Sequence, residues 1–340
     1  MTVSHYRTVT RPHWIRGASC AAVLSAIGWH AAWADDGLDL TIPTEATADA
    51  TPVPSAPSDT APRVDPGLLS KLFWSWRATS AAAEATQPNW ASPLVTTTPL
   101  LKQRLRFDTL WEQSDNGTGT TVLGGDKGLD VIVTPTNELH FALPPYDIRT
   151  GVSGAGPKHT GAIPAAAGWG DWAFFRGEQR LAAAPEGAGD YVVTAWVTIQ
   201  APSGIPPFTS NAWTYAPTIA FGKGWGNFNV QSNIGVSIPA SHAATLGHPV
   251  TINTAFLYRI MPVVWPEFEV NWTYYPDGQR GGLNQVYLTP GLILSSFKLG
   301  HGLSLTIGGG YQVAVSPTYR AKPLTPSYNH AWIFTTRLNF

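Results

Sequence analysis

The chain has 340 residues and a formal net charge of -1, which argues against a general binder of nucleic acid or of anionic membrane surfaces. Charged residues make up 13% of the sequence, below the ~25% usual for soluble domains, whereas Trp (15), Tyr (11) and Phe (13) are numerous. No apolar run of about 18 residues or more follows the N-terminal region, so we expect no transmembrane helix. Low charge and many aromatic residues without such a helix favour a β-barrel in lipid.

Residues 1–34 have the pattern of a secretory signal peptide. Arginines precede a short apolar region, and Ala32-Trp33-Ala34 gives the small-x-small pattern of a cleavage site. The one cysteine, Cys20, lies at the start of the apolar region, where we expect no lipidation. Cleavage would leave a chain without cysteine, which suits an oxidising periplasm.

Two segments separate the signal from the rest of the chain. Residues 35–66 are rich in Pro, Ala, Thr and Asp and are predicted to be a disordered linker. Residues 67–101 form a pre-barrel segment, in which apolar residues up to Trp76 share one face at helical spacing, so a short helix is expected over 67–85. This segment either plugs the barrel or contacts the periplasm, or it is a loosely held helix before the barrel, which is the interpretation that we favour.

From Lys102 to the end the apolar pattern has the period of β-strands. The candidate strands are 102–113, 128–134, 138–147, 171–183, 190–201, 213–224, 227–239, 249–261, 264–276, 285–297, 303–316 and 328–340. Short turns alternate with longer loops, and an even strand number puts both ends of the barrel on the short-turn, periplasmic side. The sequence therefore predicts an all-β fold over 102–340: a transmembrane antiparallel up-and-down β-barrel of about 12 strands in the bacterial outer membrane. We expect a monomer whose partners are outer-membrane lipid, the barrel-assembly machinery and a small-molecule solute, and not nucleic acid.

The last strand alternates up to the final residue. Trp332, Phe334, Leu338 and Phe340 share the face that would meet lipid, and Arg337 lies on the other face. The terminal aromatic resembles the C-terminal signal of outer-membrane barrels, although an edge strand of a sandwich would also alternate. Barrel closure would place this strand beside 102–113, so that Arg337 would meet one of the acidic residues of that strand.

Charged and amide side chains fall on the inward parity of several strands. The candidates to line the lumen are Arg104, Arg106, Asp108, Glu112, Arg176, Glu178, Arg180, Arg259, Glu267, Glu269, Asn271 and Arg337. One interpretation is a wet lumen of mixed charge that passes or binds a small solute. The other is an ion-paired interior that fills a narrow barrel, since buried charges must be paired to persist.

Signals for an enzyme are weak. His140 falls on the inward parity and His330 on the outward parity, but no Ser/His pair has an acid at a supporting spacing. The glycine-rich stretch 151–156 lacks the strand-to-helix setting of a phosphate site. No metal-ligand cluster is apparent in the sequence, so we expect neither catalysis, nor a cofactor, nor a metal.

Five stretches resemble a family of proteobacterial outer-membrane proteins that is associated with the meta-cleavage pathway of phenol degradation and assigned to transport. They are Gly124-Gly125-Asp126-Lys127-Gly128-Leu129-Asp130, Phe141-Ala142-Leu143-Pro144-Pro145-Tyr146, Gly168-Trp169-Gly170-Asp171-Trp172, Gly222-Lys223-Gly224-Trp225-Gly226-Asn227-Phe228 and Pro266-Glu267-Phe268-Glu269-Val270-Asn271. The resemblance spans roughly 100–340. It implies uptake of aromatic or other hydrophobic small molecules and assigns no binding residue.

The sequence thus leaves three functions to weigh. The first is a channel or transporter for small solutes, aromatic or hydrophobic compounds among them. The second is a plugged barrel with a structural or interaction role. The third, an outer-membrane hydrolase, has the least support.

Overall fold

The computed structural model describes residues 67–340 except 115, 126, 154–161, 301 and 317–327. The predicted signal peptide and linker, residues 1–66, lie outside the described residues. Helix α1 spans Leu68–Ala85, one residue shorter than expected, and the short helix α2 spans Ala243–Leu246. Of the helices in the described part of the chain, none is long and apolar enough to cross a membrane.

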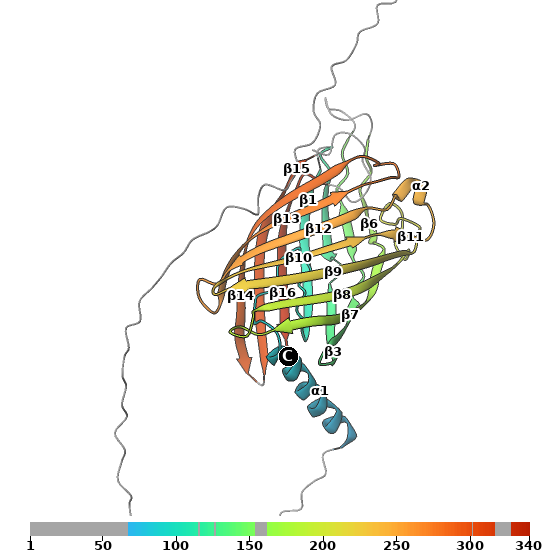
Figure 1. Cartoon of the computed structure of the whole chain (residues 1–340). Helices are drawn as coiled ribbons and strands as arrows, with labels where there is room; N and C mark the ends of the chain where they lie inside the picture. Colours follow the sequence, from blue (N-terminus) through green and yellow to red (C-terminus); the bar gives the residue numbers. More distant parts are fainter. Residues whose placement is uncertain (1–66, 115, 126, 154–161, 301, 317–327) are drawn as a thin grey trace, which may run out of the picture. The chain divides into compact units, whose positions relative to one another are not determined.

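The remaining elements are strands of one closed antiparallel sheet (Figure 1). They are β1 (Arg104–Gln113), β2 (Gly119–Gly124), β3 (Gly128–Thr134), β4 (Asn137–Ala142), β5 (Tyr146–Arg149), β6 (Ala166–Trp169), β7 (Trp172–Ala184), β8 (Tyr191–Ala201), β9 (Thr214–Trp225), β10 (Phe228–Val236), β11 (Ile238–Pro239), β12 (Val250–Tyr258), β13 (Val264–Tyr274), β14 (Asn284–Gly300), β15 (Leu303–Ser316) and β16 (His330–Asn339).

These strands make twelve barrel spans, because four spans consist of two segments each. Strand β1 pairs with both β2 and β3, so β2 and β3 are successive parts of the second span. In the same way, β4 and β5 are successive parts of one span, β6 and β7 of another, and β10 and β11 of a third. The predicted fold, a closed antiparallel barrel of twelve strands, is confirmed.

The barrel closes where β16 pairs with β1 over its whole length, from Arg104↔Asn339 to Gln113↔His330. Trp332 is 60% exposed on the outer surface, whereas Arg337 is 1% exposed and points inward. The side chains alternate in this way because residues two apart lie on the same face of a strand. The last strand therefore has the two faces that its sequence predicts.

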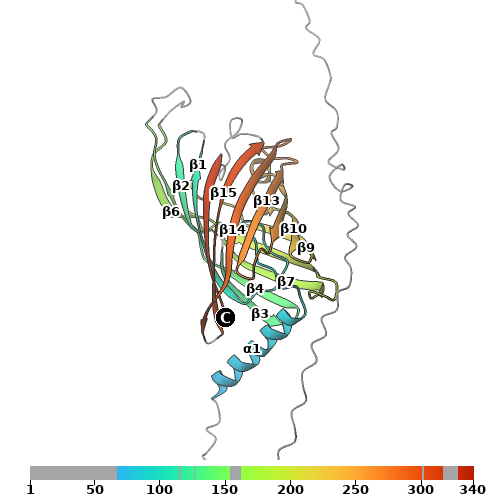
Figure 2. The ribbon, with the colours of Figure 1, turned by 90° about the vertical axis from the view of Figure 1, so that its left-hand side faces the viewer.

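Three neighbouring spans are interrupted at the same height, which the sequence did not predict. The breaks lie at 125–127, 143–145 and 170–171, and they are joined by hydrogen bonds from Leu143 N to Lys127 O (2.7 Å) and from Gly170 N to Pro145 O (2.9 Å). Proline has no N–H for a ladder, so Pro144 and Pro145 favour such an irregularity. The expected loops 114–127 and 148–170 therefore contain strand segments, β2, β5 and β6, which continue the sheet beyond the breaks (Figure 2).

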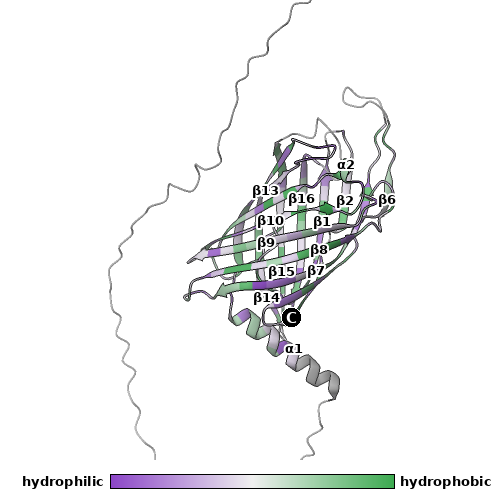
Figure 3. Cartoon of the chain, turned by 45° about the vertical axis from the view of Figure 1, so that its right-hand side comes forward, coloured by the Kyte–Doolittle hydropathy of each residue, from purple (hydrophilic) through white to green (hydrophobic). Residues whose placement is uncertain are grey.

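The outer surface of the barrel is apolar. Outward residues such as Phe221, Phe256 and Phe334 are between 37% and 51% exposed, whereas Arg106, Glu269 and Arg337 are buried inside. Figure 3 shows hydrophobic and hydrophilic residues alternating along the strands. A closed barrel has no unpaired sheet edge, so this apolar surface can face hydrocarbon. The protein is a β-barrel of the bacterial outer membrane.

The two ends of the barrel differ. The C-terminus, helix α1 and the short turn at residues 135–136 lie at one end, and α2 lies at the other (Figure 1). Short turns face the periplasm in such barrels and long loops face outward. The end that carries α1 is therefore the periplasmic end.

Candidate functional site: a segment inside the barrel

Residues 87–101, here called the plug, run from the end of α1 into the barrel. Leu94 and Leu100 are 1% exposed and Thr96 is fully buried. The plug contains no helix or strand, and among the described residues no main-chain hydrogen bond joins it to a strand of the sheet. These residues follow the expected helix of 67–85, and side chains of the barrel interior bind them.

The plug is a loop whose two ends are tied together. The side chain of Gln87 donates to Leu101 O (2.7 Å) and accepts from Leu101 N (3.1 Å). Arg180 of β7 donates to Ala83 O (2.8 Å) at the end of α1 and to Thr86 Oγ1 (2.7 Å). A cation at a helix C-terminus satisfies carbonyls that have no partner within the helix. Arg180 therefore fixes the point where the plug enters the barrel.

Arginines of β1 and β16 bind the carbonyl groups of the plug; Arg106 and Arg337 are called the arginine pair. Arg337 donates to Pro93 O (2.7 Å) and to Ser92 O. Arg106 donates to Leu94 O, and its Nη2 also lies 2.7 Å from Asp108 Oδ2. Instead of pairing with an acid of β1, Arg337 is linked to Asp108 through the hydroxyl of Thr335 (3.2 and 2.5 Å). The carbonyl dipoles of the plug therefore partly compensate the buried positive charge of these two guanidinium groups.

Carboxylates of β13 bind the amide groups of the plug; Glu267 and Glu269 are called the glutamate pair. Glu269 accepts from Val95 N (2.7 Å), Thr96 N (2.6 Å) and Thr96 Oγ1 (2.5 Å). Glu267 accepts from Leu94 N (3.2 Å). Hydrogen bonds to a charged group are the stronger kind, about 1.5–3 kcal/mol net. The plug is thus held by guanidinium groups on its carbonyls and by carboxyl groups on its amides.

Amide and hydroxyl side chains hold the rest of the plug. Gln231 donates to Ala91 O (2.9 Å) and Asn233 donates to Thr97 O (3.0 Å), both from β10. Thr194 of β8 donates to Pro99 O (2.5 Å). Asn271, a predicted lumen residue, lies 3.5 Å from Thr96 Oγ1. Most of these contacts are with main-chain atoms of the plug, so they depend little on its side chains.

Two plug side chains sit against glycines of the wall. A Cβ atom at Gly291 would lie 2.5 Å from Leu94 Cδ1, and one at Gly310 would lie 2.7 Å from the same atom. A Cβ atom at Gly222 would lie 2.5 Å from Cζ3 of Trp90. We call the surroundings of Leu94 and Trp90 the glycine sockets. These sockets were not predicted from the sequence. Their signal there is two pairs of inward-facing glycines, each two residues apart: Gly222 with Gly224 and Gly308 with Gly310.

A second group of charges lies on β3, β4 and β7 and pairs within itself; Asp130, Glu138, His140, Arg176 and Glu178 are called the ion cluster. Asp130 Oδ1 lies 2.5 Å from His140 Nδ1 and 3.5 Å from Arg176 Nη2. Arg176 also lies 3.4 Å from Glu138 and 3.3 Å from Glu178. Arg104 links this group to the plug, through Asp130 (2.7 Å) and Ser92 Oγ (2.7 Å).

Two further predicted lumen residues, Arg259 and Glu112, lie outside both the plug contacts and the ion cluster. Arg259 follows β12 at the periplasmic rim, where it pairs with Glu186 (3.1 Å) of the β7–β8 turn. In the same turn, burial and the nearby Glu186 raise the pKa of Asp190. Glu112 lies in the half of β1 beyond the plug, opposite Ala331 of β16. Whether a solute contacts any of the predicted residues stays a prediction.

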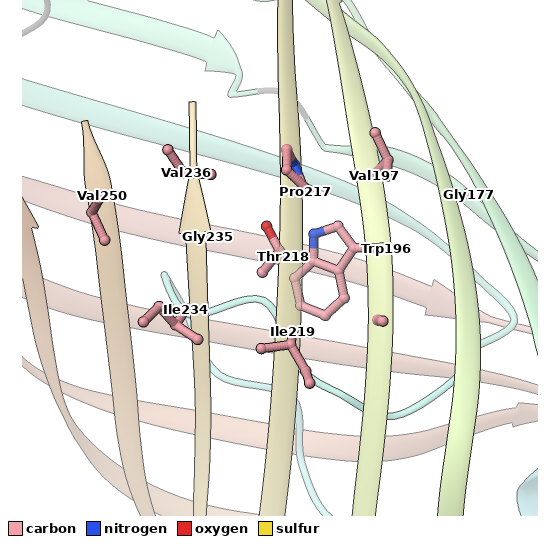
Figure 4. Close-up of a pocket in the computed structure, with 11 residues that line it drawn as sticks. Gly177, Trp196, Val197, Pro217, Thr218, Ile219, Ile234, Gly235, Val236 and Val250 are labelled. Carbon is pink, nitrogen blue, oxygen red and sulfur yellow. The ribbon is translucent and has the colours of Figure 1, made fainter. Parts of the chain in front are cut away.

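The outer wall carries an open apolar pocket of about 670 Å³. Its lining includes Val197, Pro217, Ile219, Ile234 and Val250, which Figure 4 shows on neighbouring strands. These residues have the outward parity, so hydrocarbon of the membrane covers them. We therefore do not regard this pocket as a solute site.

Features of an enzyme or metal site are weak in the structure as well. The ring of His330 lies 5.7 Å from that of Tyr311 on β15. Among the described residues there is no group of three or more His, Cys, Asp or Glu side chains that could hold a metal ion. The absence of catalysis stays a prediction.

Comparisons with known proteins add the following. No protein-family model matches the chain, and no curated protein matches it. Among solved structures, the chain is similar to the KdgM porin, at a TM-score of 0.38 and 9% identity over 69% of this chain and 99% of that one. It is also similar to OmpT, an outer membrane protein of Vibrio cholerae, both as a loop L8 deletion mutant (TM-score 0.30, 10% identity, 70% and 97% covered) and folded in vitro (0.29, 10%, 70% and 95%). The phenol meta-pathway family stays a prediction.

Proposed function

We propose that this protein is an outer-membrane channel for small solutes that the plug holds closed. The observation that carries the proposal is the way in which the plug is bound. Side chains of the wall hold it, and in the described residues no sheet ladder includes it. Such a segment can leave the lumen without opening the barrel, whereas a paired strand cannot.

The composition of the wall supports a lumen that is wet when the plug is absent. Interiors of eight-stranded barrels are filled by side chains, and 16–18-stranded porins leave an open channel. A twelve-stranded barrel lies between these sizes. Here the wall beside the plug carries charged residues and glycines, together with apolar side chains such as Leu257, Trp265 and Ile293. Water can solvate the arginine and glutamate pairs once the plug leaves.

The class of solute is the finer part of the proposal. The sequence resemblance implies aromatic or hydrophobic small molecules, and the wall beside the plug carries both charged and apolar side chains. A comparison of solutes should therefore include a hydroxylated aromatic acid, a sugar and a short peptide of similar size.

The second candidate is a barrel that the plug closes permanently, with a structural or interaction role. The tie between Gln87 and Leu101 and the anchor at Arg180 favour it, because they hold both ends of the plug in place. In this case the lumen would never conduct.

A reversible lock on the plug separates the two candidates. Leu94→Cys with Gly291→Cys in the full-length protein places two sulfurs where the side chain of Leu94 now meets the wall. Cleavage of the signal would remove the only natural cysteine, Cys20. Planar-bilayer recording should show openings in reducing buffer and none after oxidation. Leu94→Cys with Gly309→Cys is the matched control, since Gly309 faces outward and cannot form the bond.

Each result has one meaning. Openings that disappear on oxidation support the plugged channel. Openings that oxidation leaves unchanged would show that the plug is not the gate. A barrel that stays closed in reducing buffer, with every solute, would establish the permanently closed barrel instead.

A further inference from the structure

We propose that the plug occupies a binding site for peptide main chain, and that the solutes of this channel are short peptides that can adopt the bent conformation of the plug. This inference rests on the proposed function, because a solute can reach the site only if the plug leaves it.

The wall makes more hydrogen bonds to the main chain of the plug than to the side chains of the plug. Barrel side chains bind the carbonyl groups of residues 91–94, 97 and 99 and the amide groups of residues 94–96. Fewer contacts go to plug side chains, among them those to Ser92, Thr96 and Thr98. A segment selected only to fill space would pack through apolar side chains. The plug does pack Trp90, Leu94 and Leu100 against apolar wall residues, but it is bound in addition through the groups that every peptide carries.

The arrangement of charges fits the two kinds of main-chain group. Arg106 and Arg337 bind carbonyls, and Glu267 and Glu269 bind amides, on either side of Leu94. A ligand must therefore present acceptors toward β1 and β16 and donors toward β13. A peptide that bends as the plug does at residues 94–96 can do so, whereas a simple aromatic acid carries acceptors without matching donors. The contacts run from the carbonyl of residue 92 to the amide of residue 96, which is four peptide units, so a short peptide can supply most of them.

The wall can also accept a hydrogen bond from one more donor. Glu267 is 6% exposed, and its Oε2 has no hydrogen-bond partner among the described residues. A buried acceptor without a partner is unfavourable by about 1–3 kcal/mol. A ligand that brings a second donor to this point, besides the amide that replaces that of Leu94, can therefore compete with the tethered plug.

The glycine socket at Leu94 adds a preference for one side chain. Gly291, Gly308 and Gly310 leave room for the branched end of leucine between β14 and β15. We therefore expect a peptide with an inner leucine to bind better than one with an inner glutamate. Main-chain contacts supply the affinity, and the socket supplies this selectivity.

The test uses the full-length protein in proteoliposomes and measures uptake of a labelled tetrapeptide, Ala-Ala-Leu-Ala. Its matched control is the same peptide with its inner amides N-methylated, which removes the donors that the glutamate pair would bind. A trisaccharide and a hydroxybenzoate are the non-peptide probes. We expect the peptide to enter at least about tenfold faster than its N-methylated form, the equivalent of about 1.4 kcal/mol.

A second variant separates this inference from the proposed function. Glu269→Gln removes the charge that binds the plug amides, so it should reduce the preference for the unmethylated peptide. Equal uptake of both peptides, or faster uptake of the sugar or the aromatic acid, would overturn the peptide site and leave the plugged channel in place. If the reduced cysteine variant never conducts, the channel itself is disproved, and the peptide inference falls with it.

Discussion

The two groups of buried charges in this barrel solve the same physical problem in different ways. The ion cluster on β3, β4 and β7 is bound by wall residues, namely its own members and Arg104 of β1, with Asp130 at 2.5 Å from His140. The arginine and glutamate pairs on β1, β16 and β13 bind the carbonyls and amides of the plug, and Arg106 also pairs with Asp108. If the plug leaves, the first group keeps its partners and the second loses those that the plug supplies. The first group therefore maintains the barrel, and the second responds to the occupant of the lumen.

The largest expected effect is on the ion cluster. Asp130→Ala leaves Arg104, His140 and Arg176 without the carboxylate that they share. Removing one partner of a buried ion pair is unfavourable by about 3–5 kcal/mol. We expect a loss of this size in the free energy of unfolding, measured by urea denaturation of the detergent-solubilised barrel and checked by heat-modifiability on gels. An unfolding midpoint like that of the parent would contradict the structural role of the cluster.

The next-largest effect is expected when a hydrogen-bond acceptor that holds the plug is removed. Glu269→Ala removes the acceptor for Val95 N, Thr96 N and Thr96 Oγ1. At about 1.5–3 kcal/mol for a charged hydrogen bond, loss of one bond already makes an open state about ten- to hundredfold more frequent. Single-channel recording should show this increase. Glu178→Gln, a buried carboxylate of the ion cluster, is the control and should leave the open frequency unchanged.

A smaller effect is expected from filling a glycine socket. Gly291→Val places atoms where Leu94 Cδ1 now lies, 2.5 Å from the new Cβ. Overpacking of this kind is usually unfavourable by about 1–3 kcal/mol. Because the side chain of Leu94 can move away, we expect the plug to loosen while the barrel stays folded, so the open frequency should rise. Gly309→Val faces outward on β15 and should change neither property; if it opens the channel as well, the socket is not the cause.

The smallest effect is expected where a charge pair lies outside both groups. Asp277 accepts from His248 N (2.6 Å), and its Oδ2 lies 2.7 Å from His248 Nδ1, in exposed loops between strands. These hydrogen bonds from His248 lower the pKa of Asp277 below its ordinary 3.8. A carboxyl group whose pKa is lowered in the folded state stabilises the fold at pH values above its ordinary pKa. This stabilisation is lost as the pH falls through the lowered pKa. Hydrogen exchange at the loop should therefore increase only below about pH 4, while channel openings at neutral pH should be the same in Asp277→Asn as in the parent.

The sequence by itself determined the barrel, because a strand in a closed membrane sheet has one face in lipid and one inside. That constraint acts at every second residue, so Trp332 and Arg337 could be assigned to their faces from the alternation alone. The strand number and the closure of β16 on β1 followed from the same period and from the turn lengths. The segments β2 and β6 were missed because the breaks at Gly125, Pro144-Pro145 and Gly170 interrupt that period.

Only the tertiary structure decided which charged residues bind other residues of the barrel wall and which bind the plug. Parity placed the charged residues of the arginine pair, the glutamate pair and the ion cluster inside, but an inward charge looks the same in sequence whether its partner is a neighbouring strand or a distant segment. The plug is irregular, so it has no period that a sequence pattern could reveal. Its place in the lumen depends on contacts such as that between Glu269 and Thr96, 173 residues apart in the chain. Those contacts arise only when the barrel closes around the segment, which is why the lumen side chains could be predicted and their occupant could not.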